Sequence, residues 1–289
     1  MLSFADVPID FVKCYFPLFR RLPLCDDVIL EIATYLLCSS YITRVLTKQE
    51  YINCMTFVCN KCVSDMVTVN AMFCASHYGC VSIVKLLIDT NKPCTLHVIE
   101  GACKNGHVQI VELFIAANKP CCELAMQTAC EHGHIDIVRA LIAANKPCDA
   151  CAIEIASRYG FTEVVELLLA ANKPCNKSAI EWASHNGHLP IVQLLIKHDA
   201  PCYISAMLFA SKNGHLEIVR SLIAANKPCD YRAMTYASKN GHLEIVRLLI
   251  MHLQITENDF RFTFAITYSI QCAMENEHHE IVALLEEYV

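Results

Sequence analysis

A repeat of 27 residues runs through most of this 289-residue chain and restricts its fold more than any other feature. Three residue types recur in that register: a cysteine that follows proline, a glycine, and an alanine four residues before each glycine. The cysteines are Cys94, Cys121, Cys148, Cys175, Cys202 and Cys229; the glycines are Gly79, Gly106, Gly133, Gly160, Gly187, Gly214 and Gly241; the alanines are Ala75, Ala102, Ala129, Ala156, Ala183, Ala210 and Ala237. A period of this length predicts a solenoid, because one short unit buries its apolar face only by stacking on neighbours.

We count eight copies of the repeat within residues 67–289. The last copy, 273–285, matches 237–249 at a spacing of 36 residues instead of 27. The difference places an insertion of about nine residues near 253–264. Residues 1–66 lack the period and divide into an N-terminal segment, 1–20, and a helical cap, 21–66.

Each copy has the pattern of two helices. In the copy 145–171, Ala152, Ile153 and Ala156 share one helical face. Gly160 is placed to end this helix, since a glycine in left-handed geometry commonly follows a helix C-terminus. A second apolar helix follows and ends before Asn172, and the proline two residues later prevents its continuation. The sequence therefore predicts an all-α solenoid of helical pairs.

The second helix of each copy resembles the second helix of ankyrin repeats. GHVQIVELF at 106–114 and GHLEIVRLL at 241–249 carry this resemblance, and the preceding Ala-Ser-x-x-Gly resembles the end of the ankyrin first helix. The period is shorter than the usual ankyrin value of about 33 residues. The missing residues fall where the ankyrin β-hairpin finger sits, so the resemblance implies short turns there. Short repeats of this kind resemble those in proteins of large DNA viruses of amoebae and of some protists.

The stretch LPLCDDVILEIATYLL, residues 22–37, is similar to the opening of an F-box. An F-box docks on a Skp-type adaptor of a cullin ubiquitin ligase. The resemblance implies a docking face formed by Leu22, Pro23, Val28, Ile29 and Ile32. In the alternative interpretation, the same amphipathic helices only cap the apolar face of the first repeat.

The nineteen cysteines are interpreted as packing residues. The cysteines that follow proline lie one repeat apart, whereas packed helices are separated by about 8–10 Å and a disulfide requires Cα atoms within about 7 Å. The pair Cys59 and Cys62 lacks a partner pair at zinc-finger spacing. The histidines that follow the repeat glycines are expected to cap the second helix and pack in its turn. We predict no catalytic residue, metal or cofactor, and therefore no enzyme.

Charge and hydropathy narrow the class of partner. The formal net charge of −6 lacks the basic excess of a nucleic-acid binder. No uncharged apolar run reaches the roughly 18–20 residues that span a bilayer. We expect a monomer that binds neither nucleic acid nor membranes and resides in the cytoplasm (the host cytoplasm if the chain is viral).

Positions that differ between otherwise similar copies are the candidates for partner binding. The two residues before each repeat glycine vary most, and by resemblance to ankyrin proteins they face the concave groove. The predicted partner-binding residues are Tyr78, Lys104, His132, Arg158, Tyr159, His185, Lys212 and Lys239. A third row, two residues before the repeat alanine, adds a mostly acidic stripe that includes Glu100, Glu154 and Glu181. The alternative is a solvated face without function.

Two functions follow from these features. In the first, the repeats hold the substrate of a ubiquitin ligase that the F-box-like segment recruits. In the second, the chain is a stand-alone ankyrin binding module, such as a host-interaction protein. In both, the repeats bind a protein partner whose identity the sequence does not give.

Overall fold

The computed structural model describes residues 65–256 and 260–289. These residues form sixteen helices and no strand, which confirms the all-α helical-pair fold. The N-terminal segment, the F-box-like cap up to residue 64 and the predicted docking residues Leu22, Pro23, Val28, Ile29 and Ile32 lie outside the described residues. The chain divides into two compact units, Met1–Pro147 and Cys148–Val289.

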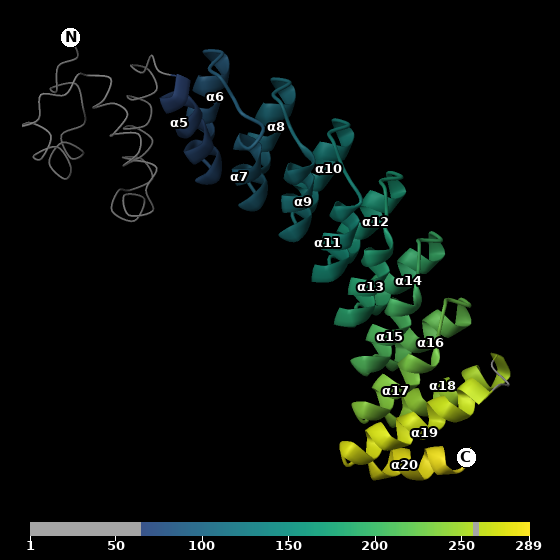
Figure 1. Cartoon of the computed structure of the whole chain (residues 1–289). Coiled ribbons are helices and arrows are strands. Elements are labelled where there is room, and N and C mark those ends of the chain that lie inside the picture. The colour runs from purple at the N-terminus through teal and green to yellow at the C-terminus, as the bar shows by residue number, and fades with distance from the viewer. Residues whose placement is uncertain (1–64, 257–259) are drawn as a thin grey trace, which may run out of the picture. The chain divides into compact units, whose positions relative to one another are not determined.

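The described part of the first unit contains three helical pairs. These are α5 (Asp65–His77) with α6 (Val81–Asp89), α7 (Val98–Lys104) with α8 (Val108–Ala116), and α9 (Glu123–Glu131) with α10 (Ile135–Ala143). The first helices α5, α7 and α9 pack side by side, and so do the second helices α6, α8 and α10. The unit is therefore two layers of parallel helices (Figure 1).

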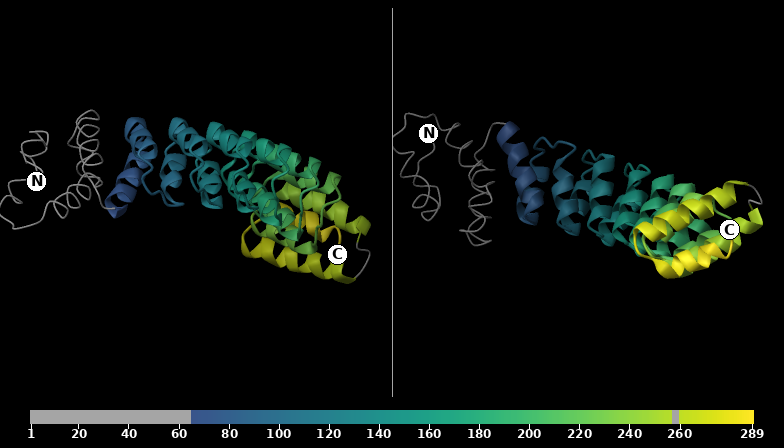
Figure 2. Two further views of the ribbon diagram at one scale, coloured as in Figure 1. Left: turned by 90° about the horizontal axis from the view of Figure 1, so that it is seen from above. Right: turned by 60° about the horizontal axis from the view of Figure 1, so that its bottom comes forward.

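The second unit repeats this arrangement five times. Its pairs are α11 (Cys151–Tyr159) with α12 (Thr162–Ala170), α13 (Lys177–Asn186) with α14 (Leu189–Lys197), α15 (Ile204–Lys212) with α16 (Leu216–Ala224), α17 (Tyr231–Lys239) with α18 (Leu243–Thr256), and α19 (Phe260–Glu275) with α20 (His279–Glu286). The first helices α11, α13, α15, α17 and α19 form one layer, and the second helices form the other. Figure 2 shows the α19–α20 pair of this unit from two further directions.

The core follows the repeat. Each repeat alanine of the first helix is fully buried, as Ala102 and Ala183 are, and its small side chain lets adjacent helices approach closely. Each second helix contributes three large apolar residues at fixed positions, such as Ile191, Val192 and Leu195. Burying such a side chain stabilises the fold by about 1.5–3 kcal/mol. The stability therefore accumulates with each stacked pair.

Within each unit, a histidine connects each helical pair to the one before it. The Nε2 atom of His215 donates to the carbonyl of His185 at 3.2 Å, and its ring lies against Gly187. The same bond joins His188 to Arg158 and His242 to Lys212. The expectation that these side chains cap their own helices is wrong at His107, His134, His188 and His215, none of which makes a cap hydrogen bond. The histidine instead reaches the preceding repeat, where the left-handed glycine leaves room for its ring.

The Asn-Lys-Pro-Cys stretch forms the turn between pairs. Its asparagine adopts left-handed geometry, with φ between 48° and 51° at Asn91, Asn118, Asn145, Asn172 and Asn226, and Asp199 replaces it once. Asparagine and aspartate tolerate this region better than other non-glycine residues. The turn is short and contains no strand within the described repeats. This agrees with the short connection that the 27-residue period implied.

The cysteine of this stretch is half-buried, so it is less enclosed than a core residue. The Cys121 thiol donates weakly to the carbonyl of Cys122 at 3.5 Å. Burial raises the pKa of Cys121, Cys148, Cys175 and Cys202 to about 11 in each case. The thiol therefore stays protonated where a redox or metal-binding cysteine would be a thiolate.

We expect this thiol series to react slowly with alkylating agents at pH 8. Only the thiolate is nucleophilic, and a pKa of about 11 at Cys175 leaves about one part in a thousand ionised. Labelling by iodoacetamide, followed by peptide mass spectrometry, should accelerate as the pH rises from 8 to 10.5. The raised pKa also means that these thiols favour folding below pH 8.5 and lose that contribution as the pH rises towards 11. Labelling at pH 8 as fast as in the denatured chain would contradict this assignment.

Candidate functional site

Aromatic and basic side chains alternate along the first-helix layer of the second unit. The Arg158 guanidinium lies 4.5 Å from the centre of the Trp182 ring. The centre of the His185 ring lies 5.6 Å from that of Trp182 and 5.4 Å from that of Phe209, and both contacts are edge to face. Lys212 continues the series with its ammonium 5.9 Å from the centre of the Tyr236 ring. We call these six residues, Arg158, Trp182, His185, Phe209, Lys212 and Tyr236, the ladder.

The ladder connects four consecutive first helices, α11, α13, α15 and α17. Its aromatic members Trp182 and Phe209 are half-buried, and Tyr236 is 37% exposed. Cation–π contacts contribute about 0.5–1 kcal/mol at exposed sites. The contacts therefore fix the orientation of these side chains while much of their surface stays accessible.

The backbone under the ladder is held from the next repeat. The carbonyl of Arg158 accepts from His188 Nε2 at 3.2 Å and from Asn186 Nδ2 at 2.9 Å. The carbonyl of His185 accepts in the same way from His215 and from Asn213, the latter at 2.8 Å. Arg158 and His185 are thus anchored twice through their main chain, and Lys212 is anchored once, by His242. A pre-organised surface loses less entropy on binding.

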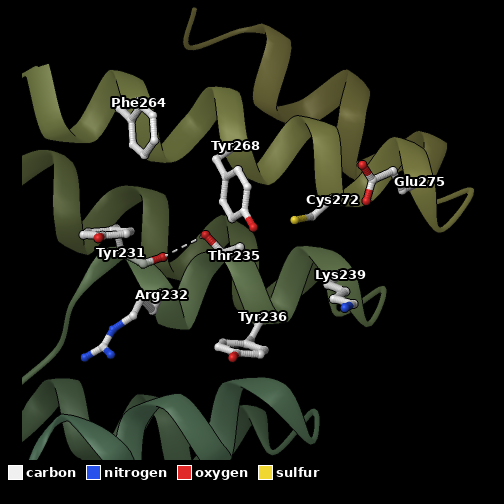
Figure 3. Close-up of a pocket in the computed structure, with 9 residues that line it drawn as sticks. All are labelled: Tyr231, Arg232, Thr235, Tyr236, Lys239, Phe264, Tyr268, Cys272 and Glu275. Atoms are coloured by element: carbon white, nitrogen blue, oxygen red, sulfur yellow. Dashed lines mark hydrogen bonds between the residues drawn. The ribbon is translucent and has the colours of Figure 1, made fainter.

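A pocket of about 430 Å³ adjoins the ladder between α17 and α19. It is lined by Tyr231, Arg232, Thr235, Tyr236, Lys239, Phe264, Tyr268, Cys272 and Glu275. Figure 3 shows Phe264 and Tyr268 on α19 directed toward Tyr231 and Thr235 of α17, with Tyr236 on the opposite side of α17. The Phe264 and Tyr268 rings stack with an interplanar angle of 1°, and both remain largely exposed at 63% and 48%. Tyr236 belongs to both the ladder and the pocket, so the two are continuous.

The insertion in the last repeat contributes Phe264 to this pocket. At the spacing of 36 residues, Phe264 stands where the preceding copy has Pro228 of its turn. In the structure the additional residues lengthen both α18 and α19, and Phe264 lies on α19 instead of in a turn. Beneath the pocket, the hydroxyls of Thr235 on α17 and Ser269 on α19 form a buried 3.1 Å hydrogen bond that joins these two helices.

Five of the predicted partner-binding residues belong to this region. Arg158, His185 and Lys212 are in the ladder, and Lys239 lines the pocket. Tyr159 lies beside the ladder, 47% exposed, with its ring 5.9 Å from Arg158. Whether any of them binds a partner stays a prediction.

The three predicted residues of the first unit are arranged differently. Tyr78 packs edge to face on His77 at 4.9 Å, and Lys104 is exposed. His132 stacks on His134 at 6.1 Å and contacts the carbonyl of Thr128 through Nδ1 at 3.0 Å.

The sequence analysis missed the aromatic half of the site. Trp182, Phe209 and Tyr236 occupy the position directly before the repeat alanine, a row that was not compared between copies. The same row holds Cys74, Gly101, Thr128 and Ile155 in the earlier copies. The change to an aromatic residue in three successive copies is visible in the sequence, and all three copies lie in the second unit.

One group of side chains in the first unit has the donor types that bind zinc. His97, Glu100 and Cys122 bring their ligand atoms within 4.8 Å of one another. Glu100 is already bonded to His97 at 2.7 Å and accepts from the Cys122 thiol at 3.5 Å. In the second unit the same two positions hold Glu154 and Asn176, which form a 2.9 Å hydrogen bond. The group therefore occupies a place where a hydrogen bond joins two consecutive repeats of the second unit.

Comparison with known proteins identifies the class. A family model described as Ankyrin repeats (3 copies) matches residues 71–153, 99–179 and 180–259. The chain belongs to the ankyrin repeat family, whose members are protein–protein interaction modules.

Solved structures also resemble part of the chain. They include the crystal structure of the human ASB11 ankyrin repeat domain, at 17% identity and a TM-score of 0.47, over 54% of this chain and 84% of that one. No curated protein matches the chain. In the residues that the structure describes, no helix has the length and apolar character to cross a membrane.

Proposed function

We propose that the second unit binds a protein partner on its first-helix layer, with the ladder at the centre of the contact. The observation that carries this proposal is the ladder itself. Tryptophan, tyrosine and arginine are the residue types most enriched in binding hot spots. In the ladder these residue types are partly exposed over four successive repeats, so they provide the kind of surface that protein partners contact. The predicted residues Arg158, Tyr159, His185, Lys212 and Lys239 belong to this surface, whereas Tyr78, Lys104 and His132 would extend it on the first unit.

The comparison of a ladder variant with the wild-type chain tests this function. Trp182→Ala removes the ring that contacts both Arg158 and His185, and Lys212→Glu reverses a charge on the same layer. Each should weaken partner binding by about 2 kcal/mol, or roughly 30-fold. The tagged full chain is used to capture proteins from the native cell, and quantitative mass spectrometry compares the amounts retained.

Arg220→Glu is the matched control, because Arg220 is an exposed cation on α16, in the layer of second helices. Proteins that wild type and Arg220→Glu retain, and that both ladder variants lose, are the expected result. Thermal unfolding of each variant shows whether the fold is intact. Equal retention by all four chains would contradict the proposal.

The role in a ubiquitin ligase is a separate proposal that rests on LPLCDDVILEIATYLL at 22–37. Leu22, Pro23, Val28, Ile29 and Ile32 would dock a Skp-type adaptor, and the ladder would then hold the substrate. A pull-down with purified adaptor, comparing wild type with Pro23→Ala and Ile29→Ala, tests it. Absence of adaptor binding by wild type leaves the alternative, a stand-alone binding module.

A further inference from the structure

We infer that the partner presents an acidic peptide segment with an aromatic anchor: the anchor fills the pocket between α17 and α19, and the acidic side chains lie along the ladder. This inference rests on the proposed function and specifies its partner. It combines three observations of the second unit, namely its uncompensated cations, its aromatic pocket, and the occupied faces of its ladder rings.

The cations of the first-helix layer lack acidic partners. Arg158, Lys212 and Lys239 are all exposed, and none is in an ion pair within the described part of the chain. They occupy one register, two residues before the repeat glycine, together with His185. The whole chain has a formal net charge of −6, so this basic row runs against the overall balance. Complementary potentials favour a partner with negative charge at this surface.

Three carboxylates near the row are already engaged. Glu154 accepts from Asn176 at 2.9 Å, and Asp230 accepts from Arg232 at 2.8 Å. Glu275, at the far end of the pocket, accepts from Gln271 at 2.9 Å. These bonds reduce the competition that the acidic side chains offer to an incoming carboxylate. Arg158, Lys212 and Lys239 therefore remain cations without a carboxylate partner in the described part of the chain.

The pocket has the lining of an anchor site. Tyr231, Tyr236, Phe264 and Tyr268 provide its apolar surface, and charged groups are confined to Arg232, Lys239 and Glu275. Aromatic pairs favour offset or edge-to-face contact with ring centres 4.5–7 Å apart. A partner's aromatic ring can make such contacts with Tyr236 on one side and Tyr268 on the other. Lys239, on the lining, would then pair with an acidic residue beside the anchor.

A single-stranded nucleic acid would also combine negative charge with stacking. Bases stack on free aromatic faces. In the ladder, the Arg158 guanidinium covers Trp182 at 4.5 Å, and Lys212 lies over Tyr236. Three cations and one histidine are also few for a surface that tracks a phosphate backbone. An acidic peptide fits the observed surface better.

Selection from a random library tests the inference without a known partner. Phage that display random 12-residue peptides are selected on the immobilised full chain, with single-stranded oligonucleotides of random sequence assayed in parallel. We expect enriched peptides to contain an aromatic residue and at least two acidic ones. Their affinity should fall about tenfold between 50 and 500 mM salt, because the exposed pairs are screened.

Variants separate the two parts of the inference. Tyr268→Ala should remove the preference for the aromatic residue and lower the affinity of the selected peptides about tenfold. The double variant Lys212→Glu and Lys239→Glu should remove the preference for acidic residues. Phe264→Ala, at a more exposed position of the same wall, repeats the pocket test if Tyr268→Ala fails to fold.

Three results would each overturn the inference. The enriched peptides could lack acidic residues, they could bind the wild type no better than the double variant, or the oligonucleotides could bind more tightly than the peptides. The proposed function fails differently, since it requires only that Trp182→Ala and Lys212→Glu lose the native partner. If that partner is lost but the selected peptides are not acidic, the ladder binds protein and the partner's chemistry is other than inferred here.

Discussion

Gly187→Val should destabilise the second unit by about 3 kcal/mol. Gly187 has φ of 80°, a region that costs a β-branched residue about 1–3 kcal/mol. A Cβ atom there would also stand 2.7 Å from Cε1 of His215, whose ring is held by its bond to the carbonyl of His185. The clash therefore breaks the link between consecutive repeats as well as straining the turn. Urea unfolding followed by circular dichroism measures the loss.

Glu277 provides a control within the same protein. It occupies the position of the repeat glycine in the last copy and has φ of 61°. In the described structure no histidine ring from a later repeat lies against it. Glu277→Gly should therefore change the free energy of unfolding by less than about 1 kcal/mol, and in the stabilising direction if strain dominates. If Gly187→Val proves as mild as Glu277→Gly, the histidine link contributes little to the stack.

Phe114→Ala should destabilise the first unit by about 3–5 kcal/mol. Phe114 lies on α8 with 1% of its surface exposed and is the largest fully buried side chain of the described structure. Truncation loses the transfer free energy of the ring and leaves a cavity in a closely packed layer. Denaturant unfolding of the full chain should show the loss as an earlier transition.

Leucine at the same position separates the cavity effect from the loss of an aromatic ring. The equivalent residues of the other copies are leucines, among them Leu87 and Leu141 in the same unit, and all of them are buried. Phe114→Leu should therefore cost only about 1 kcal/mol. A loss comparable with that of Phe114→Ala would mean that the layer around α8 cannot adjust to the consensus side chain.

The fold could be predicted from the sequence because the physical cause of each element recurs in every copy. A small alanine, a left-handed glycine and an apolar second helix are needed wherever helical pairs stack, so the period makes them visible. The role of the histidines could not be predicted in the same way. Their bond to the carbonyl of the preceding repeat depends on the distance between stacked pairs, which no local pattern contains.

The site, too, could be predicted only where its residues follow the repeat register. Comparing copies identified the basic row, since Arg158, Lys212 and Lys239 share one register. The aromatic row at Trp182, Phe209 and Tyr236 also differs between copies, so the same comparison could have identified it. The pocket was not accessible, because Phe264 faces α17 only after the additional residues have joined α19 as helix. A change of secondary structure within an insertion is not contained in the repeat pattern.

The lengthened helices α18 and α19, which belong to consecutive pairs, also bear on how the chain can be altered. The last histidine link survives the insertion, since His278 Nε2 still reaches the carbonyl of Lys239 at 3.1 Å. Additional residues between a second helix and the next first helix thus leave the stacking contacts in place. The inter-pair turns are therefore sites where new side chains can be acquired, or an affinity tag grafted, without redesigning the solenoid.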